Sequence, residues 1–168
     1  SICQGMHYAH AHGIIHRDLK PNNIVLVETD GVEVVKVVDF GLARVLDDSA
    51  AKINQHLTRT GAVMGTLFYL SPEQCTGQRG YHRSDIYALG CMLYELIAGA
   101  APFYSDNPIA IMQKHAAEAP PKLPARLHVP AELTGILHKA LAKKPEDRYQ
   151  TMHEMQADLD NLLNGHLD

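Results

Sequence analysis

The chain has 168 residues, of which 46% are hydrophobic and 20% are charged. These proportions are those of a globular domain and exclude a disordered tail or a collagen-like fibre. The longest apolar run is too short to cross a membrane, and the net charge of −4 argues against nucleic-acid binding through bulk electrostatics. Three widely spaced cysteines, Cys3, Cys75 and Cys91, favour a reducing, cytoplasmic compartment over a disulfide framework or a zinc site. We therefore expect one globular domain over residues 1–168.

The N-terminal quarter predicts a helix end followed by a small β element. Apolar residues recur at helical spacing over residues 1–12. Two β-branched runs follow, at 24–27 and 32–38, and the Asp30-Gly31 pair between them is typical of a two-residue hairpin turn. An isolated hairpin is only marginally stable, so we expect this one to pack on helices.

After an irregular stretch at 39–70, the remaining sequence has a helical pattern. Amphipathic spacing, capping residues and a proline at a first helical position predict four helices, over residues 84–97, 108–117, 133–144 and 151–162. Ser84 is the expected N-cap of the first helix, and Thr151 with Glu154 is an expected capping box for the last. Lys143 is expected to be solvated at a helix end. The prediction is a mainly α (α+β) fold, a helical bundle with a small β-hairpin.

The densest cluster of polar side chains is the stretch at 16–23, His-Arg-Asp-Leu-Lys-Pro-Asn-Asn. The carboxylate, ammonium and carboxamide groups of Asp18, Lys20 and Asn23 can accept a proton, hold a phosphate and bind a cation. Asp39 begins an Asp-Phe-Gly triplet just after the hairpin, which folds back toward Asn23. One carboxylate and one amide oxygen form a hard-oxygen site that suits Mg²⁺.

These residues resemble the catalytic loop and the Asp-Phe-Gly segment of protein kinases. Further motifs agree with that family in chain order: Gly65-Thr66, Tyr69, Ser71-Pro72-Glu73 in place of Ala-Pro-Glu, the apolar helix from Asp85, and Arg148 after Pro145-Glu146-Asp147. Lys20 looks like the Ser/Thr-specific branch, and the tract at 66–74 is most similar to bacterial serine/threonine kinases of the eukaryotic-like type. The resemblance implies the C-terminal lobe of such a kinase, which transfers the ATP γ-phosphoryl group to Ser or Thr hydroxyls of protein substrates.

The resemblance also implies a role for each polar residue of the site. Asp18 is the expected catalytic carboxylate, Lys20 neutralises charge on the γ-phosphoryl group, and Thr66 fixes both side chains through its hydroxyl. Asn23 and Asp39 are the expected ligands of Mg²⁺, with Mn²⁺ as an alternative, on the phosphates of ATP. The implied ATP-binding residues are Lys20, Asn23, Asp39 and Val25, which forms the apolar floor beneath the adenine ring.

By the same resemblance, residues 42–64 are the activation segment, with Thr58 and Thr60 as phosphorylation sites. A phosphate there is expected to pair with Arg17. The competing interpretation is that these threonines are simply solvated. The residues implied to be structural are His16 and Phe40, which stack together with Asp85 as their anchor, and Glu73 and Arg148, which form a buried ion pair.

Some parts of a complete kinase are absent from this sequence, which contains no Gly-x-Gly-x-x-Gly loop. Because the chain begins at Ser1 without Met, we expect the N-terminal lobe to lie upstream and the isolated fragment to be nearly inactive. Two alternatives remain: a non-catalytic kinase-like docking module, and a small-molecule phosphotransferase, against which the peptide-positioning tract at 65–73 argues. The expected partners are ATP and a protein substrate, with a dimer for autophosphorylation of the activation segment, and no nucleic acid.

Overall fold

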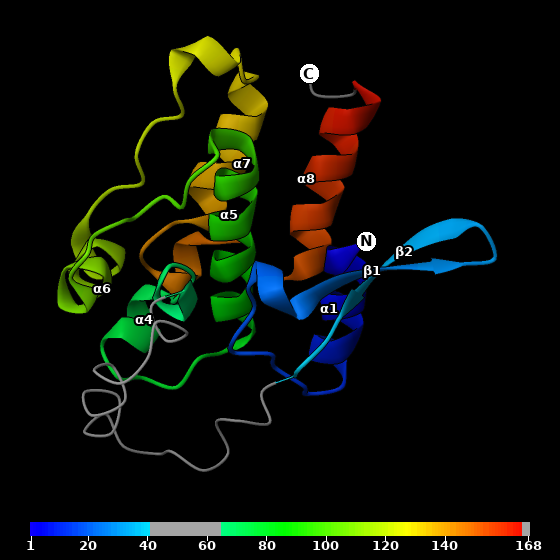
Figure 1. The fold of residues 1–168 in the computed structure, drawn as a ribbon, viewed down its shortest axis with the longest axis horizontal. Helices are drawn as coiled ribbons and strands as arrows, with labels where there is room; N and C mark the ends of the chain where they lie inside the picture. The colour runs from blue at the N-terminus through cyan, green and yellow to red at the C-terminus, as the bar shows by residue number, and fades with distance from the viewer. Residues whose placement is uncertain (41–64, 166–168) are drawn as a thin grey trace.

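The computed structural model describes residues 1–40 and 65–165, which form a helical body with one two-stranded sheet in these ranges (Figure 1). In chain order the elements are α1 (Ile2–Ala11), η1 (Pro21–Asn23), β1 (Ile24–Thr29), β2 (Val32–Val37), α4 (Pro72–Cys75), α5 (His82–Ala98), α6 (Pro108–Ala117), η3 (Ala125–Leu127), α7 (Ala131–Ala140), η4 (Pro145–Asp147) and α8 (Met152–Asn164). The predicted mainly α fold with a small hairpin is therefore confirmed. Among the described residues, no helix is both long and apolar enough to span a membrane.

The hairpin forms where it was predicted but packs on the helices only at its base. Strands β1 and β2 are antiparallel, and the turn residues Asp30 and Gly31 both have positive φ, as a two-residue hairpin turn requires. Ile24, at the base, packs against the core. Leu26 and Val32 are 64% and 61% exposed, because the hairpin projects away from the helices (Figure 1).

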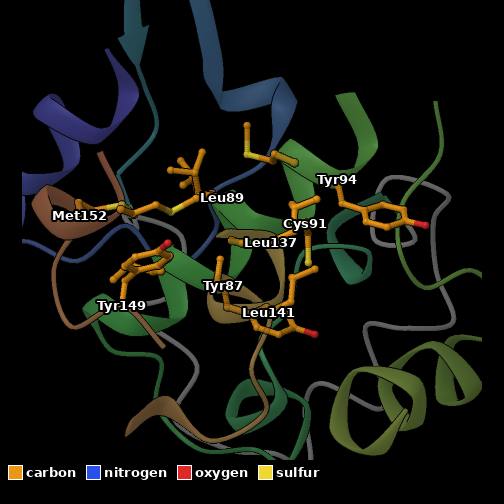
Figure 2. Packing of buried hydrophobic residues seen from close by; sticks show 14 of the residues in the cluster. Tyr87, Leu89, Cys91, Tyr94, Leu137, Leu141, Tyr149 and Met152 are labelled. Atoms are coloured by element: carbon orange, nitrogen blue, oxygen red, sulfur yellow. The ribbon is translucent and has the colours of Figure 1, made fainter. Parts of the chain in front are cut away.

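Helix α5 runs through the centre of the helical body, with α4 and α6 on one side and α1 and α8 on the other (Figure 1). Every residue from 84 to 92 is buried, and the side chains around them form the main core (Figure 2). Leu96, near the C-terminal end, is 82% exposed, so the apolar pattern of this helix corresponds to burial in its first part only. The helix ends at Gly99, whose φ of 81° is the left-handed conformation that favours glycine.

One predicted helix start and one predicted capping box need correction. Helix α5 begins at His82, because Tyr81 is its N-cap and Ser84 lies in the first turn, where the Ser84 hydroxyl accepts a hydrogen bond from the Tyr81 backbone N–H at 2.9 Å. The predicted capping box of α8 forms only by half. Thr151 accepts from the Glu154 N–H at 3.1 Å, but the Glu154 carboxylate accepts from Gln150 N–H instead of from Thr151.

Helices α5 and α7 approach closely at Gly90. A Cβ atom at this position would lie 2.9 Å from the Cβ of Ala140 and 3.2 Å from Leu141. Real Cβ atoms do not approach so closely, so two small residues set the distance between the helices. This contact fixes α7, and the loop that follows it, against the helix that anchors the candidate site.

Candidate active site

The loop at 16–23 is anchored to α5 by one buried carboxylate. Asp85 is 1% exposed and lies in the first turn of α5. Its two oxygens accept hydrogen bonds from the backbone N–H groups of His16 at 2.9 Å and Arg17 at 2.8 Å. The predicted anchoring role of Asp85 thus acts through the backbone of the loop, which it holds at the start of the polar cluster.

Arg17 has a strained backbone that three hydrogen bonds hold in place. Its φ of 65° lies in the left-handed region, which costs a non-glycine residue about 1–3 kcal/mol. Besides the bond from its N–H to Asp85, its carbonyl accepts from the Gln74 side chain at 2.9 Å, and its Nε donates to the Gly80 carbonyl at 3.3 Å. The contact of Gln74 was not predicted, and it ties the segment of α4 directly to the loop at 16–23.

His16 connects this loop to the end of the hairpin. The side chain is fully buried, and its Nδ1 accepts a hydrogen bond from the Asp18 N–H at 3.3 Å. Nε2 lies 2.9 Å from the Val38 carbonyl oxygen, which can only accept a hydrogen bond, so Nε2 carries a proton and donates to it. The predicted contact with Phe40 is present, with ring centroids 4.9 Å apart and the planes tilted by 47°.

Lys20 lies between Asp18 and Thr66, which are far apart in the sequence. Its Nζ donates to Asp18 Oδ2 at 2.8 Å and to Thr66 Oγ1 at 2.9 Å. The Thr66 hydroxyl was predicted to fix both side chains, but among the described residues its side-chain hydrogen bond is to Lys20 alone. The side chains of Asp18 and Lys20 are 31% and 20% exposed, so the pair is accessible from solvent.

Asn23 and Asp39 lie together at the base of the hairpin. The Asn23 side chain is buried, and its Nδ2 donates to the Asp18 carbonyl at 2.8 Å, which directs the other end of the amide, Oδ1, away from the loop. The Val38 N–H donates to the Asn23 carbonyl at 2.9 Å, and this bond places the next residue, Asp39, near Asn23. Asp39 is exposed and has a φ of 58°. One amide oxygen and one exposed carboxylate fit a magnesium ion that keeps most of its ligands from water and phosphate. Among the described residues, no three His, Cys, Asp or Glu side chains form a metal site by themselves.

The remaining predicted residues are placed only in part. Val25 lies on β1, paired with Lys36 on β2, and is 39% exposed. Thr58 and Thr60, with the predicted activation segment at 42–64, lie outside the described residues. The Arg17 guanidinium, their predicted partner, is half-buried beside Gly80.

The predicted buried ion pair between Glu73 and Arg148 is present and bidentate. Glu73 Oε1 and Oε2 accept from Arg148 Nη1 at 2.9 Å and Nη2 at 2.8 Å. The other three N–H groups of Arg148 donate to the backbone carbonyls of Ala142, Arg83 and Lys143, so all five donors are used. Burial alone would raise the pKa of Glu73, but the hydrogen bonds from Arg148 and Ser84 outweigh it and lower this pKa to about 2.

Two further contacts of the site were not predicted. His10 places its Nε2 2.8 Å from Asp85 Oδ2 and so gives the anchoring carboxylate a third partner, beside the backbone N–H groups of His16 and Arg17. Its signal was its position on the face of α1 that also carries the buried residues Cys3 and Met6. Tyr69 donates to the Glu95 carboxylate at 2.6 Å, which fixes the segment after Thr66 to α5.

Comparisons with known proteins agree with this geometry. A family model described as the protein kinase domain matches residues 1–159. The serine/threonine-protein kinase PknB of Mycolicibacterium smegmatis is 47% identical over 165 residues, which cover 97% of this chain and 25% of that protein. PknB of Mycobacterium tuberculosis is 47% identical over 164 residues, with the same coverage. A probable serine/threonine-protein kinase PknB of Corynebacterium glutamicum is 44% identical over 169 residues, which cover 96% of this chain and 25% of that protein.

The chain thus spans about a quarter of the length of the curated relatives it matches. Protein kinases in general use ATP and a divalent cation, which agrees with the hard-oxygen donors at Asn23 and Asp39. The motifs at 16–23, the Asp-Phe-Gly triplet and the Glu73–Arg148 pair all fall inside the matched residues. The chain therefore belongs to the protein kinase family, in its bacterial, eukaryotic-like serine/threonine branch.

Proposed function

We propose that this chain forms the catalytic side of an ATP cleft and transfers the γ-phosphoryl group of ATP to Ser or Thr hydroxyls of protein substrates. The observation that carries the proposal is the arrangement around Asp18. Lys20 is held between Asp18 and Thr66 at 2.8 and 2.9 Å, and the Asn23 amide is fixed on the Asp18 carbonyl at 2.8 Å. A docking module has no chemical need for a carboxylate, an ammonium group and an amide fixed to one another in this way.

Phosphoryl transfer depends on positioning and charge stabilisation more than on covalent chemistry. In the proposed reaction, Asp18 orients the acceptor hydroxyl and accepts its proton. The Lys20 ammonium group, held by Thr66, stabilises negative charge that develops on the transferred group. Mg·ATP, when bound, supplies the phosphoryl group and the bridging cation, which Asn23 Oδ1 and the Asp39 carboxylate would hold.

The cleft needs parts that these 168 residues do not contain. No glycine-rich phosphate loop occurs in the sequence, and the relatives are about four times longer than the chain. The proposal therefore includes an N-terminal lobe supplied by a further segment of the complete protein. Three exposed valines of the hairpin, Val25, Val32 and Val34, lie on one face of it by the strand register and support this part of the proposal, because an exposed apolar surface marks a contact with another element.

The proposal is tested by Asp18→Asn in the complete protein, with phosphate transfer from radiolabelled ATP to a protein substrate as the assay. The expected result is a loss of at least a hundredfold, because the substitution removes the group that accepts the proton. Asp147→Asn, at an exposed position in η4, is the matched control and should keep full activity. Phosphate transfer that survives Asp18→Asn at the full rate would refute the catalytic assignment and leave the docking module as the better hypothesis.

The proposed regulation concerns Thr58 and Thr60. A phosphate on either residue carries a charge of about −2 and pairs well with a guanidinium group. Arg17, which directly precedes Asp18, is the expected partner. Mass spectrometry of the active, complete protein should find phosphate on at least one of the two threonines. Active protein in which both are unmodified would contradict this part of the proposal.

A further inference from the structure

The segment after Thr66 carries one aromatic side chain near the surface. Leu67 and Leu70 are buried in a small cluster with α6, but Phe68 between them is only half-buried. Because residues 66 and 68 are two positions apart, their Cα atoms are separated by at most about 7 Å. Phe68 therefore lies close to the Thr66 hydroxyl, which Lys20 Nζ binds at 2.9 Å.

Tyr104, in the connection between α5 and α6, stacks on Phe68. The two ring centroids are 5.8 Å apart, and the ring planes are tilted by only 20°. Tyr104 is nevertheless 63% exposed. Since one face of its ring lies against Phe68, the exposed surface includes the opposite face. The protein thus has an open aromatic face that rests on the segment at 66–70.

A carboxylate lies at the edge of the same ring. The Tyr104 hydroxyl donates to Asp106 Oδ1 at 2.7 Å, and Asp106 is exposed. A carboxylate offers about four acceptor positions, so this bond leaves room for further donors. The Asp106 carboxylate can therefore accept hydrogen bonds from a ligand that lies over the Tyr104 ring.

The chain on either side of these two residues is fixed in place. Phe103, which directly precedes Tyr104, is 1% exposed, and its ring packs edge-on against His115 with centroids 4.9 Å apart. Asn107, which directly follows Asp106, is the N-cap of α6, and its side chain accepts from the Ile109 N–H at 2.9 Å. The aromatic face and the carboxylate are therefore held in position before a ligand binds, which lowers the entropy cost of binding.

An aromatic face beside a carboxylate fits the side chain of arginine. A planar guanidinium group stacks on aromatic rings and also donates two parallel hydrogen bonds to a carboxylate. The ammonium group of lysine is a compact, strongly hydrated charge and combines the two contacts less well. An apolar side chain could stack on the ring but would give the carboxylate no donor. The chemistry of the two groups together thus favours arginine over lysine and over an apolar residue.

We propose that Tyr104 and Asp106 form a specificity subsite for an arginine of the protein substrate, whose guanidinium group stacks on the Tyr104 ring and donates to the Asp106 carboxylate. The inference rests on the proposed kinase function, in which the acceptor hydroxyl lies at Asp18. The bonds from Lys20 to Asp18 and to Thr66 join that position to the segment on which the Tyr104 ring rests. An extended peptide advances about 3.3 Å per residue, so this arginine lies within a few residues of the acceptor Ser or Thr.

The first test uses the complete protein and a peptide library in which each position around the acceptor Ser or Thr is varied in turn. At one position, the wild-type protein should favour Arg over Ala by about three- to thirtyfold in kcat/KM, with Lys between them. This is the combined effect of one exposed cation–π contact and one exposed ion pair. Asp106→Asn keeps an acceptor for the Tyr104 hydroxyl but removes the charge, and Tyr104→Leu removes the ring. Each variant should lose most of the preference, with kcat/KM for the Ala peptide and the KM for ATP unchanged.

The matched controls change the same residue types at other exposed positions. They are Asp160→Asn on α8 and Tyr8→Leu on α1, and both should keep the wild-type preference. Charge reversal gives a result that a merely structural role would not produce. Asp106→Arg should favour Glu over Arg at the same position of the peptide, because the charge that the subsite presents is reversed.

Three results would each overturn the inference. They are no arginine preference in the wild type, an arginine preference that survives both variants, and a preference for apolar residues that Asp106→Asn leaves unchanged. A complete protein whose phosphate transfer is absent or does not depend on Asp18 refutes the proposed function instead. Phosphate transfer that depends on Asp18 but shows no arginine preference refutes only the subsite, which distinguishes the two failures.

Discussion

Replacing Arg148 by methionine should destabilise the fold by about 3–5 kcal/mol, the usual effect of removing one partner of a buried ion pair. Methionine fills part of the space but has no donor. The Glu73 carboxylate would then stay buried with the Ser84 hydroxyl as its remaining side-chain partner among the described residues. Three backbone carbonyls, those of Ala142, Arg83 and Lys143, would also lose their donor.

The pKa of Glu73 gives a second, independent magnitude. The hydrogen bonds that overcome its burial lower this pKa from 4.5 to about 2. At about 1.4 kcal/mol per pKa unit, the difference of roughly 2.5 units corresponds to about 3 kcal/mol in favour of the ionised form. Because the folded-state pKa is lowered, this stability is complete above pH 4.5 and is lost as the pH falls from 4.5 toward 2. Arg148→Met should abolish most of that loss.

The assay is urea unfolding of the complete protein followed by circular dichroism at 222 nm, which reports on helix content. Hydrogen exchange of the α4 peptides locates the change. Arg126→Met, at an exposed position in η3, is the matched control and should lie within about 0.5 kcal/mol of wild type. The double variant Glu73→Gln/Arg148→Met should recover part of the loss, because it leaves no buried charge. A loss below 1 kcal/mol, or strictly additive single effects, would refute the reasoning.

Three further predictions concern other contacts. Burial lowers the pKa of His115 to about 3 in the folded state, whereas the same side chain in the unfolded chain binds a proton below pH 6.5. The free energy of unfolding should therefore fall by about 2 kcal/mol between pH 7 and pH 5. Urea unfolding of His115→Phe at these two pH values should show a smaller fall. Lys20→Met should reduce phosphate transfer by about a hundredfold or more without a change in the thermal midpoint, because the side chain is part-exposed; equal activity would remove Lys20 from the mechanism. Gly90→Ala should cost about 1–3 kcal/mol in thermal unfolding, because its Cβ meets Ala140 at 2.9 Å, while Gly135→Ala, on α7 with open space around it, should be neutral or stabilising.

The residues of the catalytic loop could be predicted because they are contiguous. Asp18, Lys20 and Asn23 lie within six positions, and the hairpin between them and Asp39 has a clear turn signal. The resemblance then supplied the partner of Glu73, which lies 75 residues further along the chain. The pattern of a short segment could therefore specify which groups meet at the catalytic loop.

Contacts between distant segments could not be predicted in the same way. Gln74 bonds to Arg17, 57 residues away in the sequence, and His10 bonds to Asp85, 75 residues away. Neither residue type by itself predicts such a contact. Lys143 was expected to be solvated. The helical pattern shows which face of a helix is apolar, but it does not show that the Lys143 ammonium group lies beside the backbone carbonyls of Lys114 and His115. Lys143 is half-buried instead, and desolvation lowers its pKa to about 8. Ser84 was taken for an N-cap because serine suits both that position and the first turn.

Three polar contacts of the site each involve a side chain of α5. Asp85 holds the catalytic loop, Ser84 holds Glu73, and Glu95 holds Tyr69 of the segment at 66–70. Each of these three residues lies on a helix whose N-terminal two-thirds is buried, so its side chain cannot move far without disturbing the core. The loop at 16–23 and the segment at 66–70 are thus both attached to α5, and the bond from Lys20 to Thr66 also joins them to each other. A substitution that weakens the attachment of the segment at 66–70, such as Glu95→Gln, should therefore change the KM for a peptide substrate more than the KM for ATP.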